Sequence, residues 1–298
     1  MPNHPAKPSP IFTEEFTEPL ADRLNKEEAM LSFYWLGQAG FVLSTANWQL
    51  MIDPYLSDSL ARKYTGKPLP HLRLMKPPLR LDEISRLDFV LCTHRHGDHM
   101  DPDTIRYFAS KYSECRFVVP APEQDYALSL GIAPGRLIGA VAEEQIILAA
   151  DLKVRPLPAA HEEFERDALG RHRYVGFWLS AANHSIYHSG DSIPFDGLAK
   201  RLHDLGCEVA LLPVNGRDDF RKSQGIPGNF SLQEAIQLCT EAEIKSIVAH
   251  HYGMFEFNTI PAELIDQAAS EASELVQVVR ARTSVRYMLG LAEGRNVV

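Results

Sequence analysis

The regular alternation of apolar and polar residues begins near Leu31. Short runs rich in β-branched and aromatic residues at 31–36, 41–44 and 49–52 are separated by turn-forming residues, which predicts an antiparallel meander. Residues 1–28 precede this pattern, and we predict that they form a tail or a docking segment.

Beyond the meander, buried apolar runs alternate with helical patterns. A capping box formed by Ser231 and Glu234 marks the start of one of these helices. The predicted strands are 89–93, 116–120, 145–148, 152–157, 176–179, 185–188, 209–214, 246–249 and a last strand pair near the C-terminus. The predicted helices are 103–112, 122–130, 196–205, 231–243 and 261–275. Each half of the chain therefore begins with consecutive strands and continues with strands that alternate with helices. The prediction is an α/β protein in which residues 29–298 form one four-layer αββα sandwich.

Composition narrows the function classes. The chain has 298 residues, of which 45% are hydrophobic, and a net charge of −9, which argues against binding nucleic acid through bulk charge. No window reaches the ~18 apolar residues of a membrane span, and the N-terminus lacks a signal-peptide pattern. We therefore expect a cytoplasmic protein with a small-molecule substrate and neither a nucleic-acid nor a membrane partner; a homo-oligomer stays open. The four scattered cysteines favour buried thiols over disulfides.

The strongest chemical signal is the run from Thr93 to Asp101, directly after a buried strand. It contains His94, His96, Asp98 and His99 within six residues. A loop at a strand end lets such side chains converge on one point, and imidazole with carboxylate suits zinc, manganese or iron.

Four more polar residues stand at the ends of predicted strands: Asp53, His161, Asp191 and His251. Each alone is a weak signal, because a single histidine at a strand end is more often structural. Together they supply what a two-metal centre needs beyond the histidine loop, and such a centre makes water nucleophilic at neutral pH.

The loop resembles the H-x-H-x-D-H signature of the metallo-β-lactamase superfamily. The segments 35–37, 81–91, 187–192 and 250–251 are similar to the L-ascorbate-6-phosphate lactonase family within it. The resemblance implies two divalent ions, zinc or manganese, with iron as a third candidate. It implies a first ligand group of His94, His96 and His161 and a second of Asp98, His99 and His251, with Asp191 as bridging carboxylate. Asp98 and Asp191 would be the catalytic carboxylates, and Asp53 would hold the ligand loop from behind.

The function implied by this resemblance is a metal-dependent hydrolase. A metal-bridging hydroxide would open a lactone or related ester of a small, phosphorylated sugar acid. The alternative is a phosphodiesterase acting on RNA or on a phospholipid head group.

Other polar residues are predicted around the metal ligands. Alternation along a strand directs His250 away from His251, so it should support the site from behind or be structural. Arg217 and Asn215, in a loop after a strand, are candidate substrate contacts, although a solvated loop is equally compatible with the pattern. Asn229 either contacts substrate or initiates a helix, and His172 is expected to reach substrate from a flap.

Overall fold

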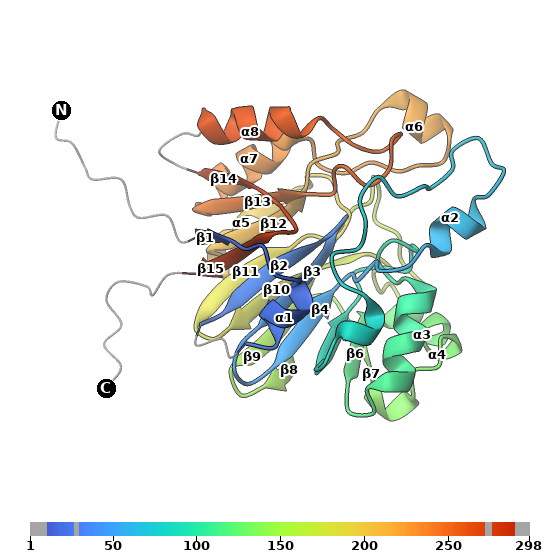
Figure 1. The fold of residues 1–298 in the computed structure, drawn as a ribbon. Helices are drawn as coiled ribbons and strands as arrows, with labels where there is room; N and C mark the ends of the chain where they lie inside the picture. The colour runs from blue at the N-terminus through green and yellow to red at the C-terminus, as the bar shows by residue number, and fades with distance from the viewer. Residues whose placement is uncertain (1–10, 27–29, 272–275, 290–298) are drawn as a thin grey trace, which may run out of the picture.

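Two mixed β-sheets face each other in the computed structural model, which describes residues 11–26, 30–271 and 276–289 (Figure 1). The first sheet runs in the spatial order β1 (Ile11–Glu15), β15 (Val285–Leu289), β2 (Ser32–Gly37), β3 (Gly40–Ser44), β4 (Gln49–Ile52), β5 (Phe89–Leu91), β6 (Arg116–Pro120) and β7 (Leu137–Ala140). The second runs β14 (Gln277–Arg280), β13 (Ser246–His250), β12 (Val209–Pro213), β11 (His184–His188), β10 (Val175–Ala181), β9 (Leu152–Pro158) and β8 (Ile146–Ala149).

Helices cover the outer faces of both sheets. The helices are α1 (Leu20–Leu24), α2 (Ser59–Lys63), α3 (Pro102–Lys111), α4 (Gln124–Ser129), α5 (Leu198–Asp204), α6 (Asp219–Ser223), α7 (Leu232–Glu241) and α8 (Ala262–Ser270). Short 3₁₀ turns span Leu81–Glu83, Ala121–Glu123 and Pro134–Arg136. Helices α3 and α4 lie beside the first sheet, and α5, α7 and α8 lie beside the second.

The alternation seen in the sequence explains these layers. In β2, Phe33 and Trp35 pack between the two sheets, whereas Tyr34 and Leu36 pack outward in the cluster that includes Phe108 of α3. Both faces of this strand are therefore buried, as a sandwich with outer helices requires. The predicted four-layer αββα fold is confirmed.

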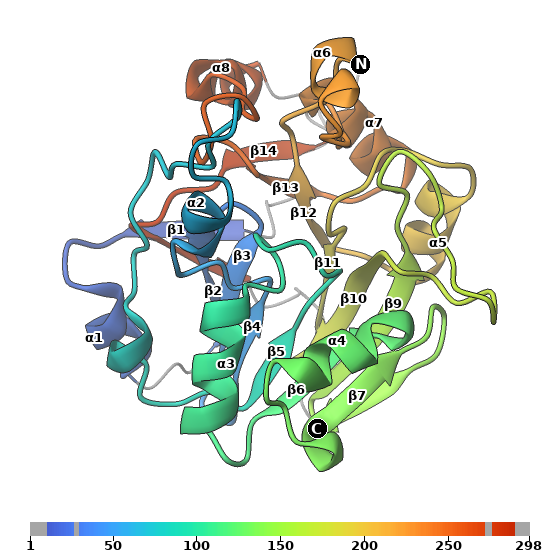
Figure 2. The same cartoon turned by 90° about the vertical axis from the view of Figure 1, so that its right-hand side faces the viewer.

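Parallel pairing concentrates the loops on one edge. Strands β4 to β7 pair in parallel, as do β11 to β14. Figure 2 views the molecule from the side of the connections between these elements, where α2 and α6 lie. The segments after β4, β5, β9, β11 and β13 carry the predicted metal ligands and Asp53, so the topology gathers them at the same edge.

Both ends of the described chain join the first sheet. Residues 11–15 form edge strand β1, paired antiparallel with β15, and Phe16 and Leu20 pack on the first sheet's outer cluster. Residues 11–24 therefore form a docking segment, which is one of the two possibilities predicted for residues 1–28, and not a free tail. Residues 1–10, 27 and 28 lie outside the described residues. The expected last strand pair is wrong, because β14 and β15 belong to different sheets. Strand β7 was not predicted. Pairing partners are chosen by tertiary packing, and strand periodicity does not encode them.

All four cysteines are buried and free of disulfides, as predicted. Within the described residues, none of the helices has the length and apolar composition needed to pass through a bilayer.

Candidate metal centre

Asp53 organises the loop that follows β5. Its carboxylate accepts hydrogen bonds from the backbone N–H of Thr93 (2.7 Å) and the Thr93 hydroxyl (2.6 Å). It also lies 2.7 Å from Nδ1 of His99. This contact orients the imidazole so that Nε2 faces the other ligands, which is the supporting role predicted for Asp53.

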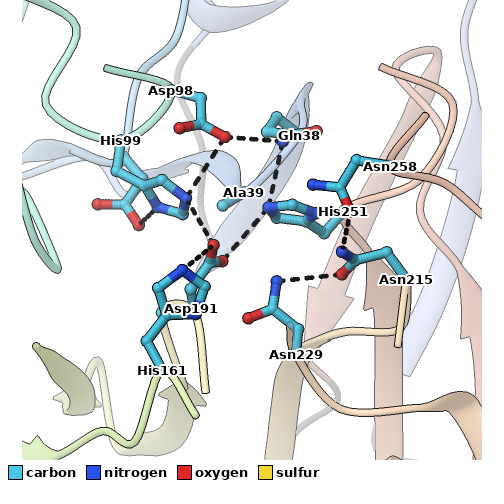
Figure 3. A network of polar contacts seen from close by, with 12 residues as sticks. Gln38, Ala39, Asp98, His99, His161, Asp191, Asn215, Asn229, His251 and Asn258 are labelled. Carbon is cyan, nitrogen blue, oxygen red and sulfur yellow. Dashed lines mark hydrogen bonds and ion pairs between the residues drawn. The ribbon is translucent and has the colours of Figure 1, made fainter. Parts of the chain in front are cut away.

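All seven predicted ligands come together at this edge. Ligand atoms of the first group lie within 4.8 Å of one another, and so do those of the second group. Asp191 lies between the groups (Figure 3): its Oδ1 is 3.3 Å from Nε2 of His251, and its Oδ2 is 3.3 Å from Nε2 of His99 and 3.7 Å from Nε2 of His161. A carboxylate in this position can serve both groups.

The unpaired atoms of the cluster fit divalent cations. His94 Nε2 is buried without a hydrogen-bond partner among the described residues, and His99 Nε2 and Asp191 Oδ1 have only the 3.3 Å contacts with Asp191 and His251. Leaving such atoms unpaired is costly, so their convergence indicates an ion. The donors are nitrogen and oxygen without sulfur, which suits zinc, manganese and iron alike.

Burial and neighbouring charges set the protonation of the ligands. Burial, with His99 and His96 nearby, holds the pKa of His94 well below its usual value, and burial lowers the pKa of His161 to about 4. Both rings are neutral and keep a lone pair for a metal. Burial would raise the pKa of Asp191, but His251 and His99 hold it well below its ordinary value.

Backbone strain gathers at the same place. Gln38, Asp53 and His251 have φ angles of 50°, 46° and 63°, a left-handed conformation that side chains with a Cβ rarely adopt. Gly190, beside Asp191, has φ 60°, and a Cβ there would lie 2.7 Å from Cβ of Thr93. The turn that presents Asp191 therefore requires glycine.

His250 points away from the centre, as predicted. Its ring stacks on His188, with centroids 5.1 Å apart, and meets Phe41 edge-on. His188 Nε2 lies 2.8 Å from the carbonyl oxygen of Ala39, and its Nδ1 accepts from the N–H of Gly190. Both rings belong to the layer between the sheets.

A cleft of about 1170 Å³ opens over the ligands. Helix α2 forms part of its wall and lies against the metal loop, since a Cβ on Gly97 would be 2.7 Å from the Leu60 side chain. The cationic residues that line the cleft are Lys63, Lys67, Arg95, Arg106 and Arg173. The apolar and aromatic lining of the cleft includes Leu60, Tyr64, Leu69, Tyr126, Phe255 and Phe257.

Arg217 is not at this cleft, which corrects its predicted role. Both ends of its guanidinium bind Glu234, at 2.6 and 2.7 Å, and one also donates to the carbonyl oxygen of Asn229. Glu234 is the residue that closes the capping box with Ser231. Arg217 therefore stabilises the start of α7 and does not act as a substrate contact.

The other three predicted substrate residues also fall outside the described lining of the cleft. Asn215 donates to Oδ1 of Asn258, which does line the cleft, and Asn229 donates to Oδ1 of Asn215 (Figure 3). These two asparagines lie one and two side chains behind the surface. His172 is buried against the Phe164 ring, while its neighbours Arg173 and Tyr174 reach the cleft.

Sequence reasoning missed Gln38 and Tyr174. Gln38 contacts two ligands of the second group, and the Tyr174 hydroxyl lies 3.5 Å from Nε2 of His96. Burial raises the pKa of Tyr174 to about 12, so this hydroxyl keeps its proton. Neither residue forms part of the metal motif, and the only available signal was the position of each beside a predicted turn or strand.

The sandwich and its histidine–carboxylate cluster define a metal-dependent hydrolase. A model of the beta-lactamase superfamily domain matches residues 49–252, so the chain belongs to this family, and its fold is the metallo-β-lactamase fold.

Three comparisons place the chain among its relatives. The mitochondrial N-acyl-phosphatidylethanolamine-hydrolyzing phospholipase D of Saccharomyces cerevisiae is 24% identical over 79% of this chain and 51% of its own, so the match spans about half that relative. A metal-dependent hydrolase of Hyperthermus butylicus is 29% identical over 74% of this chain and 83% of its own. A solved metallo hydrolase of Ignicoccus hospitalis has a TM-score of 0.63 at 17% identity, covering 88% of this chain and 100% of that one, and shows the shared fold. The comparisons give no specific support to the lactonase family.

Proposed function

We propose that the protein is a phosphodiesterase that hydrolyses a small amphiphilic phosphodiester of the phospholipid head-group type. From the sequence alone this was the alternative to a lactonase. It moves ahead because the yeast relative, and a second from Caenorhabditis elegans at 23% identity, are named as phospholipases D that hydrolyse N-acyl-phosphatidylethanolamine.

The observation that carries the proposal is the charge of the cleft. Five cationic side chains line it in a protein whose net charge is −9, whereas Glu123 and Glu165 are the described lining carboxylates outside the ligand groups. Glu123 lies 2.5 Å from Arg173 and 3.8 Å from Arg95, and Asp103 lies 3.7 Å from Arg106. Lys63 and Lys67 are the lining cations that have no carboxylate partner among the described residues. A cleft that concentrates positive charge favours an anionic substrate.

Lys63 and Lys67 take over the role of cationic substrate contact that the sequence suggested for Arg217. Their ammonium groups lie 5.3 and 5.0 Å from the centre of the Tyr64 ring, and neither has a carboxylate partner among the described residues. Phe255 and Phe257, with stacked rings, supply an apolar wall nearby. This combination suits a substrate with a charged and an apolar part.

The remaining roles belong to the edge of the sheets. The two ligand groups and Asp191 would hold two divalent ions, which when bound supply Lewis acidity toward phosphoryl oxygens and lower the pKa of water. Asp53 keeps His99 oriented. The Tyr174 hydroxyl, protonated at neutral pH, can donate a hydrogen bond to a substrate oxygen near His96.

The competing proposal is a lactonase that acts on a lactone of a phosphorylated sugar acid. The same metal ligands could activate water for attack on a carboxyl ester. The volume of the cleft speaks for the larger substrate, since it exceeds the roughly 300–1,000 Å³ typical of small-ligand pockets.

The test compares substrates on protein loaded with zinc or manganese. We expect turnover of N-acyl-phosphatidylethanolamine in mixed micelles and of bis-p-nitrophenyl phosphate, and little turnover of sugar lactones with or without phosphate. Lactone turnover without phosphodiester turnover would reverse the choice.

A variant pair tests the lysines. Lys63→Ala combined with Lys67→Ala should lower kcat/KM for the anionic lipid roughly tenfold, because charge-assisted contacts at a partly exposed site are weakened by solvent. Lys76→Ala is the matched control, since Lys76 is an exposed lysine of the same connection that does not line the cleft. Equal losses in both proteins would remove the lysines from substrate binding.

A further inference from the structure

Gln38 lies where the second ligand group meets. It follows β2 and its side chain is completely buried. Its Nε2 donates to Oδ2 of Asp98 at 2.8 Å and lies 3.1 Å from Nε2 of His251 (Figure 3). One amide nitrogen thus faces donor atoms of two ligands.

These contacts compete with a cation. An amide N–H can only donate, so it uses lone pairs that Asp98 and His251 would offer to a metal. The first ligand group is more open: His94 Nε2 has no partner in the part of the chain that is described, and the contact of His96 with Tyr174 is longer, at 3.5 Å.

We propose that Gln38 occupies the second cation position in the metal-free protein and thereby makes the second ion bind more weakly than the first. Ions then load in order, first at His94, His96 and His161. The side-chain oxygen of Gln38 is buried without a partner among the described residues.

The backbone of Gln38 is held independently of its side chain. Its carbonyl oxygen accepts from Nε1 of Trp35 at 2.9 Å and from the N–H of His251 at 3.0 Å. A substitution can therefore remove the amide while the turn stays joined to the end of β13.

The experiment titrates metal-free protein with zinc in a calorimeter, with a competing chelator, and counts ions per chain after dialysis. Wild type should bind two ions in separate steps. Gln38→Leu should tighten the second step by roughly tenfold, the worth of a hydrogen bond to a charged group, and leave the first unchanged. Gln38→Glu should tighten it further, since it adds a negative ligand.

Gln49→Leu is the matched control. Gln49 is also a buried glutamine, but its amide donates to the carbonyl oxygen of Arg86, and it belongs to neither ligand group. The Gln49→Leu variant should change neither zinc-binding step. Melting temperatures check that every variant folds. An unchanged or weaker second step in Gln38→Leu would overturn the proposal, as would equal affinities of the two ions in wild type. Substrate plays no part in this test, so the result is independent of the phosphodiesterase assignment.

Discussion

His250 and His251 are adjacent and almost equally buried, at 0% and 1% exposure, yet they belong to different regions. His250 is the last residue of β13, and its ring lies between the sheets against His188 and Phe41. His251 has a left-handed φ of 63°, and its Nε2 faces Asp191. A single strained peptide unit separates an inter-sheet histidine pair from the metal centre.

Burial by itself does not make a histidine functional; its neighbours do. Around His251 the carboxylates of Asp191 and Asp98 supply negative charge, which favours a cation. Around His250, burial and the nearby His188 and His251 hold its pKa well below the usual value, against the opposing effect of a contact with the Leu211 backbone. The surroundings of His251 therefore favour a bound cation, whereas those of His250 favour an uncharged ring.

The largest effect should come from exchanging each neighbour for alanine. His251→Ala should lower activity on the order of 100-fold or more and lose one ion, since even residues behind the ligands cost ~10–100-fold. His250→Ala should retain both ions and lose about 2–4 kcal/mol of stability to the cavity. Metal analysis, kcat/KM and denaturant unfolding measure the contrast. If His251→Ala kept two ions, the two regions would not differ as argued.

Asp191→Asn tests the carboxylate shared by both ligand groups. The amide preserves size but removes the charge that balances two cations, so occupancy at one or both positions should fall, with a loss of activity on the order of 100-fold. The packing of His250 against His188 should be unaffected. The melting temperature of the metal-free variant should therefore equal that of the metal-free wild type. Unchanged ion content would show that Asp191 is not the bridge.

Asp53→Asn should have a smaller effect. The amide can still contact Thr93, but it no longer carries the charge that faces Nδ1 of His99. We expect a loss of roughly 10–100-fold in metal affinity. The measurement is zinc competition with a chelator, and wild-type affinity would mean that Thr93 and the loop backbone orient His99 without help.

The sequence was most informative where chemistry is local. Three histidines and an aspartate in one loop, after a strand of buried-strand length, had few alternative explanations, and the remaining ligands fell at the ends of strands. The separation of His250 from His251 followed from alternation, although the left-handed turn that completes it was not visible.

Residues whose roles depend on distant partners could not be assigned. Arg217 was a candidate substrate contact because nothing in the sequence links it to Glu234, 17 positions away. Lys63 and Lys67 received no predicted role, since their position at the cleft depends on how α2 packs. Gln38 meets Asp98 across 60 positions and His251 across 213. Such contacts are made by the tertiary fold and leave no periodic signal.

The smallest effect is expected inside the inter-sheet pair, where His250→Phe replaces a buried, neutral ring by an apolar ring. At pH 7 the free energy of unfolding should change by about 1 kcal/mol or less, because the two rings are similar in shape and a single contact, with the Leu211 backbone, is lost. The folded protein keeps this histidine neutral, whereas the unfolded chain protonates it below its pKa of ~6.5. Wild type therefore has this contribution in full above that pH and loses it as the pH falls, by up to about 2 kcal/mol at pH 5. The variant lacks the loss, so unfolding of the two proteins should diverge between pH 7 and pH 5. Parallel pH profiles would mean that His250 binds its proton equally in both states, and that the contrast with His251 rests on position alone.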